Sequence, residues 1–459
     1  MRGSPFRAWL EERVLVADDD WLVVDKPSGF VPRAVDARDA CDVVSRLQAH
    51  LTSAGRNAYL GACPRLHAAS SGVLPFVRRP ELDADVSSEL ATGKLRERYL
   101  AAIEIGSRSA LARQQTLSLE HRLQGVGESL RVARSGGSLH RTSCKVLERR
   151  GTRAIVELAP RTGGALELCA QLAGSDAPVA GDRAGGGAFM PRVLMHRHSV
   201  ELAGRRFASP MPALMRQWLA GDATALGAGD ELARRVRDAA CRRYPLLAST
   251  QALRWINGEG DELAGVVVDW YAGYATLSTS SDEAFERREE LAARLHEEGA
   301  EGVYLKVRAR VDLRRVNHIE LAPPLPVAGQ AAAERLEVRE PALRAWVFLG
   351  DGLSSGLFLD QRDNRQRVRQ VAAGTRVLNL FSYTCSFSVA AALGGATHVT
   401  SVDLSKRALR RGERNFALNG LDPQQHAFVQ LDALRFLERG RTRRERFDLV
   451  VLDPPSFSS

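Results

Sequence analysis

The chain has 459 residues, too many for one hydrophobic core, so its length predicts two to four domains. A composition of 44% hydrophobic and 26% charged residues excludes a mainly disordered or collagen-like chain. No run reaches the roughly 18–20 uninterrupted apolar residues of a membrane helix. The first residues, MRGSPFRAWLEERV, lack the apolar stretch of a secretory signal. We therefore expect a cytoplasmic protein with no membrane partner.

Charge and cysteine content give two further expectations. The net charge is 64 − 55 = +9, and only five of the 64 basic residues are lysines. Arginine binds phosphate in a bidentate manner and stacks on bases, which favours a nucleic-acid partner, although a GC-rich genome also enriches arginine. The six cysteines form no CxxC pair, so we expect reduced thiols and no metal site; they are Cys41, Cys63, Cys144, Cys169, Cys241 and Cys385.

The first region, about 14–205, is rich in predicted strands. Apolar or alternating runs closed by Gly or Pro mark these strands, namely VLVADDDWLVVDKPSG, ERYLAAIEI and TRAIVELAP. The Gly-rich run GDRAGGGA near its end predicts a surface loop. The sequence pattern of residues 206–245 predicts helices with a flexible break, and hence a linker.

The rest of the chain divides into two regions. The second, about 246–340, mixes strands at LAGVVVDWY and GVYLKVRAR with an amphipathic helix at EAFERREELAARLHEEG. The third, from about 345, alternates strands at RVLNLF, HVTSVD, HAFVQLD and FDLVVLD with intervening helical patterns. This βαβα alternation predicts a parallel sheet with helices on both faces.

Polar residues follow the predicted strands of this third region. The first strand holds Asn379 and leads into Ser382, Tyr383 and Thr384; the later strands end at Asp403, Asp432 and Asp453. An acid about 20 residues after the first turn suits ribose hydroxyls. Because no GxGxxG turn follows the first strand, a phosphate-free nucleoside such as S-adenosylmethionine fits better than a dinucleotide. The competing interpretation is that these acids only cap the following helices.

Five ordered motifs give this region a family resemblance. They are GLFLDQRDNR, VLNLFSYTCSFSVAAALGGA, SVDLSKRAL, RNFALNGL and FDLVVLDPPSF. The region closely resembles bacterial large-subunit ribosomal RNA methyltransferases, which are class I S-adenosylmethionine enzymes. One branch makes 5-methylcytosine and another makes 7-methylguanine. The resemblance covers 350–459 strongly and extends more weakly to about 250 through INGEGDELAGVVVDWY.

The resemblance implies roles for individual residues. Asn379, Phe381, Tyr383 and Thr384 would line the methionine side of the cofactor, Asp403 would hold the ribose, and Asp432 would lie by the adenine. The catalytic segment facing the target base would comprise Asp453, Pro454, Pro455 and Phe457. Arg362 would contact the cofactor carboxylate, or would equally form a surface ion pair with Asp360.

Two departures from the family pattern stand out. Cys385 occupies a position where the family usually has Gly, and we expect a small packed residue there. The sequence ends directly after the fourth strand, so we expect a truncated sheet with a bare hydrophobic edge. Methylation at carbon-5 of cytosine needs a Cys nucleophile, whereas methylation of a guanine nitrogen does not. No Cys follows Asp453, so the target base stays open.

The N-terminal region resembles RluA-type pseudouridine synthases over about 190 residues. The motifs that carry this resemblance are LVVDKPSG, PRLHAASSGVL, ERYLAAIEIG, TSCKVLERRGTRAIVELAPRTGG and PRVLMHRHSVEL. The family's RLD motif reads Arg65, Leu66, His67 here, so His67 replaces the catalytic Asp. An imidazole, mostly neutral at pH 7, cannot replace an anionic nucleophile. GALELCAQLA replaces the family's RNA-contact strand, and Tyr99 keeps the position of the active-site Tyr.

These observations predict a multidomain α+β and α/β protein. We expect a pseudouridine-synthase-like mixed β domain at 1–205, a helical linker at 206–245, a small α+β middle domain at 246–345, and an incomplete Rossmann-like class I methyltransferase domain at 346–459. The expected function is methylation of RNA, most simply ribosomal RNA, with a non-catalytic docking domain that reads shape and phosphates. The alternatives are an RNA-binding protein without catalysis and an active pseudouridine synthase. The sequence gives no oligomeric state.

Overall fold

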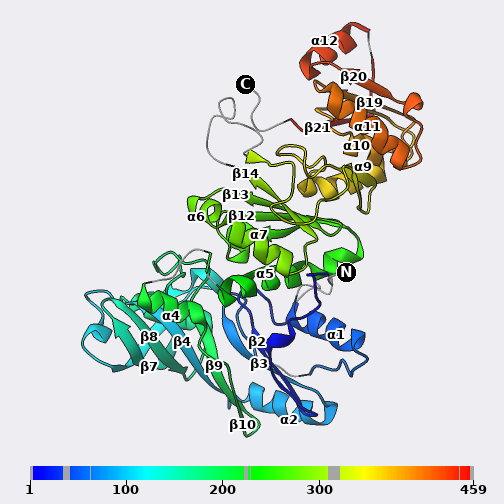
Figure 1. Ribbon diagram of the computed structural model, residues 1–459. Helices are drawn as coiled ribbons and strands as arrows, with labels where there is room; N and C mark the ends of the chain where they lie inside the picture. The colour runs from blue at the N-terminus through cyan, green and yellow to red at the C-terminus, as the bar shows by residue number, and fades with distance from the viewer. Residues whose placement is uncertain are drawn as a thin grey trace. The chain divides into compact units, whose positions relative to one another are not determined.

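The computed structural model describes residues 4–34, 42–61, 64–221, 226–227, 229–308, 321–443 and 445–454. The chain forms two compact units (Figure 1). The N-terminal unit comprises 6–245 and 259–264, and the C-terminal unit comprises 1–5, 246–258 and 265–459. Within the described ranges, none of the helices is both long and apolar enough to cross a membrane.

A ten-stranded sheet organises the N-terminal unit. Its order is β1-β2-β3-β9-β4-β8-β7-β5-β6, and β10 pairs with β9. The strands are β1 (Val14–Ala17), β2 (Trp21–Lys26), β3 (Ser71–Val77), β4 (Arg96–Glu104), β5 (Thr116–Gln124), β6 (Arg131–Val132), β7 (Ser138–Arg150), β8 (Arg153–Pro160), β9 (Met195–Leu202) and β10 (Arg205–Ala208). The pairing is antiparallel except between β3 and β9. This is the mixed β fold expected for the region.

Within the residues that the structure describes, the α-helices of this unit are α1 (Val43–Ser53), α2 (Pro80–Ala91), α3 (Ala165–Gly174), α4 (Ala213–Ala220) and α5 (Asp230–Arg243). The sequence indicated a linker over 206–245, but both of its helices pack into the unit. Leu214 and Trp218 of α4 lie in one buried cluster with Leu100 and Ile155 of the sheet. Cys241 of α5 lies in the largest core cluster. Their apolar faces are therefore covered by this unit's own strands.

The first part of the C-terminal unit contains the sheet β11-β12-β13-β14-β15 and the hairpin β16-β17. Its elements are β11 (Ala252–Asn257), β12 (Val266–Tyr271), β13 (Tyr274–Thr279), α6 (Asp282–Glu286), α7 (Arg288–Glu297), β14 (Gly302–Val307), β15 (Ala328–Gly329), β16 (Leu336–Arg339) and β17 (Arg344–Val347). The helix expected over 283–299 is interrupted at Arg287, where α6 ends and α7 begins. The expected strands at 263–271 and 302–310 are β12 and β14.

The second part is a four-stranded parallel sheet of order β20-β19-β18-β21 (Figure 1). Its elements are α9 (Arg362–Val371), β18 (Arg376–Leu380), α10 (Ser386–Leu393), β19 (His398–Asp403), α11 (Lys406–Leu418), β20 (Ala427–Gln430), α12 (Ala433–Arg443) and β21 (Leu449–Leu452). The expected alternation of strand and helix is confirmed.

Helices cover both faces of this parallel sheet. Leu378 and Leu380 of β18 pack with Phe436 of α12, whereas Val377 packs with Ala391 of α10. Alternate residues of a strand point to opposite faces, which explains why neighbours in β18 contact different helices. On β21, which pairs with β18 at one end of the sheet order, Leu452 is 63% exposed.

Candidate cofactor site and the cleft beside His67

The parallel register brings the ends of four strands to one edge of the C-terminal sheet. Leu380 is paired with Val402 of β19 and with Leu452 of β21, and Asp403 is paired with Gln430 of β20. The residues that follow each strand therefore begin at the same edge, where open parallel sheets bind their ligands.

The segment after β18 is a strained and tightly held loop. Phe381, Tyr383 and Cys385 have φ values of 55°, 46° and 61°, which are unusual for residues with side chains. The Ser382 N–H donates to the Val402 carbonyl over 3.0 Å, and the Thr384 hydroxyl donates to the Gly356 carbonyl over 2.6 Å. The loop is thus fixed to β19 on one side and to the 353–360 segment on the other.

Asp403 connects this loop to the end of β19. Its Oδ2 accepts from the Tyr383 N–H and its Oδ1 accepts from the Ser405 N–H, each over 2.8 Å. An ionised carboxylate offers about four lone-pair positions, so these two bonds leave room for two further donors. Asp403 can therefore order the loop and still accept hydroxyl groups of a ribose.

Asp432 and Asp453 occupy the two outer strand ends. Asp432 Oδ1 accepts from the Arg435 N–H over 3.0 Å, so this oxygen caps α12 as the competing interpretation expected. Asp453 and Pro454 are exposed. Partial burial and the nearby negative charge of Asp360 raise the pKa of Asp453. Pro455 and Phe457 lie outside the described residues.

Two predicted cofactor residues use their side chains within the fold. Asn379 is 1% exposed, and its amide donates to Ser388 Oγ of α10 over 2.9 Å, so it faces the helix-covered side of β18. Phe381 packs beside Leu380 in the cluster under α12. Tyr383 is different: its backbone is bound to Asp403, and its ring lines two surface hollows.

Arg362 has a third arrangement besides the two expected from sequence. Its Nη2 donates to the Ala252 carbonyl over 3.2 Å, and its Nε lies 3.9 Å from Glu340 Oε1. Glu340 also forms a buried bidentate pair with Arg365, with distances of 2.6 and 2.8 Å. The acidic neighbour of Arg362 is therefore Glu340 rather than Asp360, and Arg362 joins α9 to β11.

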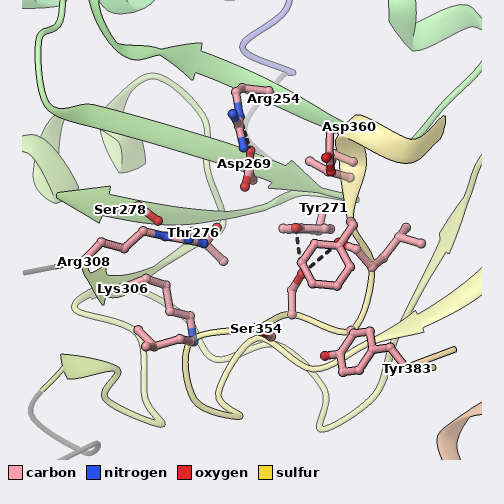
Figure 2. A pocket seen from close by; sticks show the side chains of 16 residues that line it. Arg254, Asp269, Tyr271, Thr276, Ser278, Lys306, Arg308, Ser354, Asp360 and Tyr383 are labelled. Carbon is pink, nitrogen blue, oxygen red and sulfur yellow. Dashed lines mark hydrogen bonds and ion pairs between the residues drawn. The ribbon is translucent and has the colours of Figure 1, made fainter. Parts of the chain in front are cut away.

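A small cavity of about 70 Å³ lies beside this site (Figure 2). Side chains of β11–β14 line it together with the 353–360 segment and Tyr383. The Tyr271 hydroxyl lies 2.8 Å from Ser355 Oγ. Lys306 Nζ donates to the Leu349 carbonyl over 2.6 Å and also to that of Gly352, and burial lowers the pKa of Lys306 to about 8. Sequence reasoning missed this wall, although a Lys within the apolar run GVYLKV was a visible signal.

In the N-terminal unit, the turn after β2 holds the loop that carries His67. Lys26 is fully buried and donates to the carbonyls of Pro27, Phe30 and Ala68 over 2.8, 2.9 and 3.1 Å. Burial holds the pKa of Lys26 well below its usual value. His67 is exposed, and its Nδ1 accepts from the Ala69 N–H at 3.3 Å. The LVVDKPSG motif thus fixes the backbone of the loop that carries His67.

Arg65 and Tyr99 lie on either side of a buried arginine. Arg197 is fully buried, and its Nη1 donates to the Arg65 carbonyl over 2.9 Å and to Glu97 over 2.7 Å. The Tyr99 hydroxyl donates to the same Glu97 over 3.3 Å, and burial raises the pKa of Tyr99. Tyr99 is 1% exposed, so its side chain lies in the core of this unit.

A cavity of about 540 Å³ opens beside His67. Small apolar side chains of α3 form much of its lining, including Ala165, Leu166 and Cys169. Burial raises the pKa of Cys169. The segment that the sequence identified as eroded therefore forms a helix wall with no cationic side chain at these positions.

The parallel sheet and its strand-edge site lie in a part of the chain that is similar to known methyltransferases. Residues 326–459 match the model of the S-adenosylmethionine-dependent methyltransferase family. Over 216 residues the chain is 37% identical to a ribosomal RNA large subunit methyltransferase of Deinococcus radiodurans, covering 47% of this chain and 53% of the relative. The chain thus spans about half the length of the curated relatives it matches.

Two of the solved structures similar to this chain have the following extents of similarity. A Streptococcus mutans protein assigned as an S-adenosylmethionine-dependent methyltransferase is 33% identical with a TM-score of 0.47, covering 51% of this chain and 62% of its own. Human RNA pseudouridylate synthase domain containing protein 4 is 16% identical with a TM-score of 0.37, covering 46% of this chain and 94% of its own. The interpretation of the N-terminal unit rests on its motifs and its geometry.

Proposed function

We propose that this protein is an S-adenosylmethionine-dependent methyltransferase that modifies ribosomal RNA in the cytoplasm. The observation that carries the proposal is the strand-edge arrangement in which Asp403 holds the Tyr383 backbone and keeps acceptor positions available. The likeness of 326–459 to the methyltransferase family supports the cofactor, and the likeness to large-subunit enzymes supports the RNA substrate. The domain match does not favour an RNA-binding protein without catalysis or an active pseudouridine synthase.

The chemistry of the side chains fits this cofactor. Asp403 and Asp432 supply carboxylate oxygens for ribose hydroxyls and for an adenine amine, and the loop of Tyr383 closes the methionine side. A hollow of about 360 Å³ is lined by Tyr383 and Ser405, directly beside Asp403. When bound, S-adenosylmethionine supplies an electrophilic methyl group on a sulfonium.

The protein's own part in the reaction is chiefly positioning. Methyl transfer requires the acceptor atom to lie in line with the methyl group, which fixed side chains achieve by removing rotational freedom. Asp453, with Pro454, Pro455 and Phe457, is proposed to orient the target base, and the Asp453 carboxylate can accept from an exocyclic amine. Cytosine and guanine both carry such an amine.

Cys385 does not serve as the nucleophile that carbon-5 chemistry needs. It is fully buried, and burial raises the pKa of its thiol to about 12, so it stays protonated at neutral pH. Both target bases therefore remain within the proposal.

The N-terminal unit is proposed to be a non-catalytic RNA-docking domain. Its retained scaffold around Lys26, the exposed His67 in place of an Asp, and the apolar wall of α3 support binding without isomerisation. We propose the organisation in which residues 1–205 form this domain, 246–345 the middle domain and 346–459 the methyltransferase domain. The packing of α4 and α5 extends the first domain through 245.

Calorimetric titration of the whole protein with S-adenosylmethionine tests the proposal, followed by transfer of labelled methyl groups to transcribed 23S ribosomal RNA. We expect saturable binding and incorporation of label. RNA binding without cofactor binding would leave only the non-catalytic alternative. Pseudouridine formed by the wild type and lost in His67→Ala would instead overturn the docking role of the N-terminal unit.

A further inference from the structure

One face of α11, the helix labelled in Figure 1, carries several positively charged residues in the C-terminal unit. The α11 cationic face consists of Lys406, Arg407, Arg410, Arg411 and Arg414. Their spacing of i, i+4 and i+8, with a second row at i+1 and i+5, places them together on the helix surface. Apolar residues of the opposite face, including Leu409 and Phe416, are buried in the core. The charges therefore occupy the side that packing leaves to solvent.

Most of this charge is not neutralised. Arg407 and Arg411 share one carboxylate, that of Asp351, over 2.7 and 2.5 Å. Lys406, Arg410 and Arg414 make no ion pair within the part of the chain that the structure describes, and Lys406 and Arg410 are exposed, as is Arg414. Two acids lie near these three cations. Glu413 is close to them in sequence, and Glu334 lines the same surface hollow as they do.

The α11 cationic face lines a hollow that shares residues with the hollow beside Asp403. A hollow of about 460 Å³ is lined by the five cations with Glu334 and Phe348. The hollow of about 360 Å³ beside Asp403 shares Arg407 and Arg411 with it. That second hollow shares Tyr383 and Ser354 with the cavity of Figure 2. Through these shared residues the three hollows neighbour one another, from the α11 cationic face to Tyr383 of the loop after β18.

We propose that the α11 cationic face binds the phosphate backbone of the RNA substrate and guides the strand to the loop of Tyr383. The inference rests on the proposed function, because it assigns a binding surface to the same substrate. Arginine suits phosphate through paired N–H donors. Successive positions Lys406, Arg410 and Arg414 lie about 6 Å apart along the helix axis, which lets one strand meet them in sequence.

The lining of the hollow favours RNA over an acidic protein as the binding partner. Arg411 stacks on the Phe348 ring with its guanidinium carbon 3.8 Å from the centroid, so the floor of the hollow is fixed by packing. The unpaired cations line the hollow and are exposed, as expected for contacts that follow a backbone rather than read bases. An apolar anchor pocket for a protein partner is not part of the lining of this hollow.

The test compares RNA binding by the whole protein and by Arg410→Ala/Arg414→Ala, using a fluorescein-labelled transcript of 23S ribosomal RNA at several salt concentrations. Each lost phosphate contact reduces the magnitude of the slope of log affinity against log salt by about 0.7. The slope of the double variant should therefore be smaller in magnitude by about 1.4. Affinity at low salt should fall several-fold. Arg410→Lys/Arg414→Lys should keep the slope, because the charges remain.

Arg435→Ala/Arg439→Ala on α12 is the matched control, since it removes two exposed arginines with the same i, i+4 spacing. It should bind RNA as the wild type does. An unchanged slope in the α11 variant, or an equal loss in the α12 variant, would overturn the inference. Titration of both variants with S-adenosylmethionine should match the wild type. Failure of the wild type to bind that cofactor would defeat the proposed function instead, whatever the RNA result.

Discussion

The backbone N–H of Tyr383 donates to Asp403 Oδ2 over 2.8 Å, across a separation of 20 residues. This bond joins the strained loop after β18 to the end of β19, and Asp403 Oδ1 is held in turn by the Ser405 N–H. One side chain therefore organises two of the four strand ends that form the candidate cofactor site.

Asp403→Ala should weaken S-adenosylmethionine binding at least tenfold. Hydrogen bonds to a charged group contribute about 1.5–3 kcal/mol each, and 1.4 kcal/mol corresponds to tenfold in affinity. Calorimetric titration measures the loss. Asp422→Ala is the control, because Asp422 is an exposed acid that caps a short turn through the Gln424 N–H. Equal affinities for Asp403→Ala and the wild type would show that the carboxylate does not contribute to the cofactor site.

Gly412→Ala should destabilise the C-terminal unit by about 1–3 kcal/mol through overpacking. A Cβ at position 412 would lie 2.3 Å from Cys385 Sγ, and both residues are buried between α10 and α11. Cys385→Gly/Gly412→Ala should recover most of the loss, because it removes the clashing thiol and suits the left-handed φ of 61° at 385.

Thermal unfolding of the single and double variants measures this coupling. Gly440→Ala on α12 is the control: its Cβ would come no closer than 3.8 Å to another residue, so Ala should be neutral or slightly stabilising. A stable Gly412→Ala variant would contradict the packing argument. The expectation that Cys385 is a small packed residue would then lose its structural basis.

The sequence predicted the parallel sheet and its strand ends because both depend on local patterns. The strands containing Asn379, Asp403 and Asp453 are short apolar runs, and parallel register then aligns their ends without further information. That Asn379 turns away from this edge was not predictable. Alternation along the strand places the Asn379 side chain on one of the two faces of the sheet. Only its hydrogen bond to Ser388 shows that this is the face covered by α10.

The side chains that the sequence misplaced have partners far along the chain. Arg362 lies beside Glu340 and Ala252, which are 22 and 110 residues away, and no local pattern relates them. The sequence predicted a linker over 206–245 because its helical pattern contains a flexible break. Leu214 packs with Leu100, more than a hundred residues earlier.

Asp360→Asn should shift the acid limb of the methyl-transfer rate to lower pH. The charge of Asp360 helps to raise the pKa of Asp453, so its removal lets Asp453 ionise at lower pH. The rate of label transfer between pH 4 and pH 7 measures the shift, with Asp422→Asn as the control. If the acid limb stays in place or moves to higher pH, the ionisation that it reports is not that of Asp453.

Lys306→Met should remove a rise in stability with pH that the wild type shows in mildly alkaline solution. Burial lowers the pKa of Lys306 to about 8 from its usual 10.5, although the charge of Asp351 acts in the opposite direction. Between pH 8 and 10.5 the unfolded chain therefore binds more protons at this site than the folded chain. The free energy of unfolding then rises with pH across that window, and the contribution is lost as pH falls through the folded pKa.

The difference between wild type and variant isolates this group from the other residues that titrate in the same range. Chemical denaturation at pH 7.5 and at pH 10 should show a larger advantage of the wild type at the higher pH. At pH 10 a neutral amine still donates to the carbonyls of Leu349 and Gly352, so the segment beside the cofactor loop stays anchored without a desolvated charge. Lys94→Met, at an exposed position, is the control and should give the same difference at both pH values. A constant difference for Lys306→Met would mean that its ammonium is as well solvated in the folded protein as in the unfolded chain.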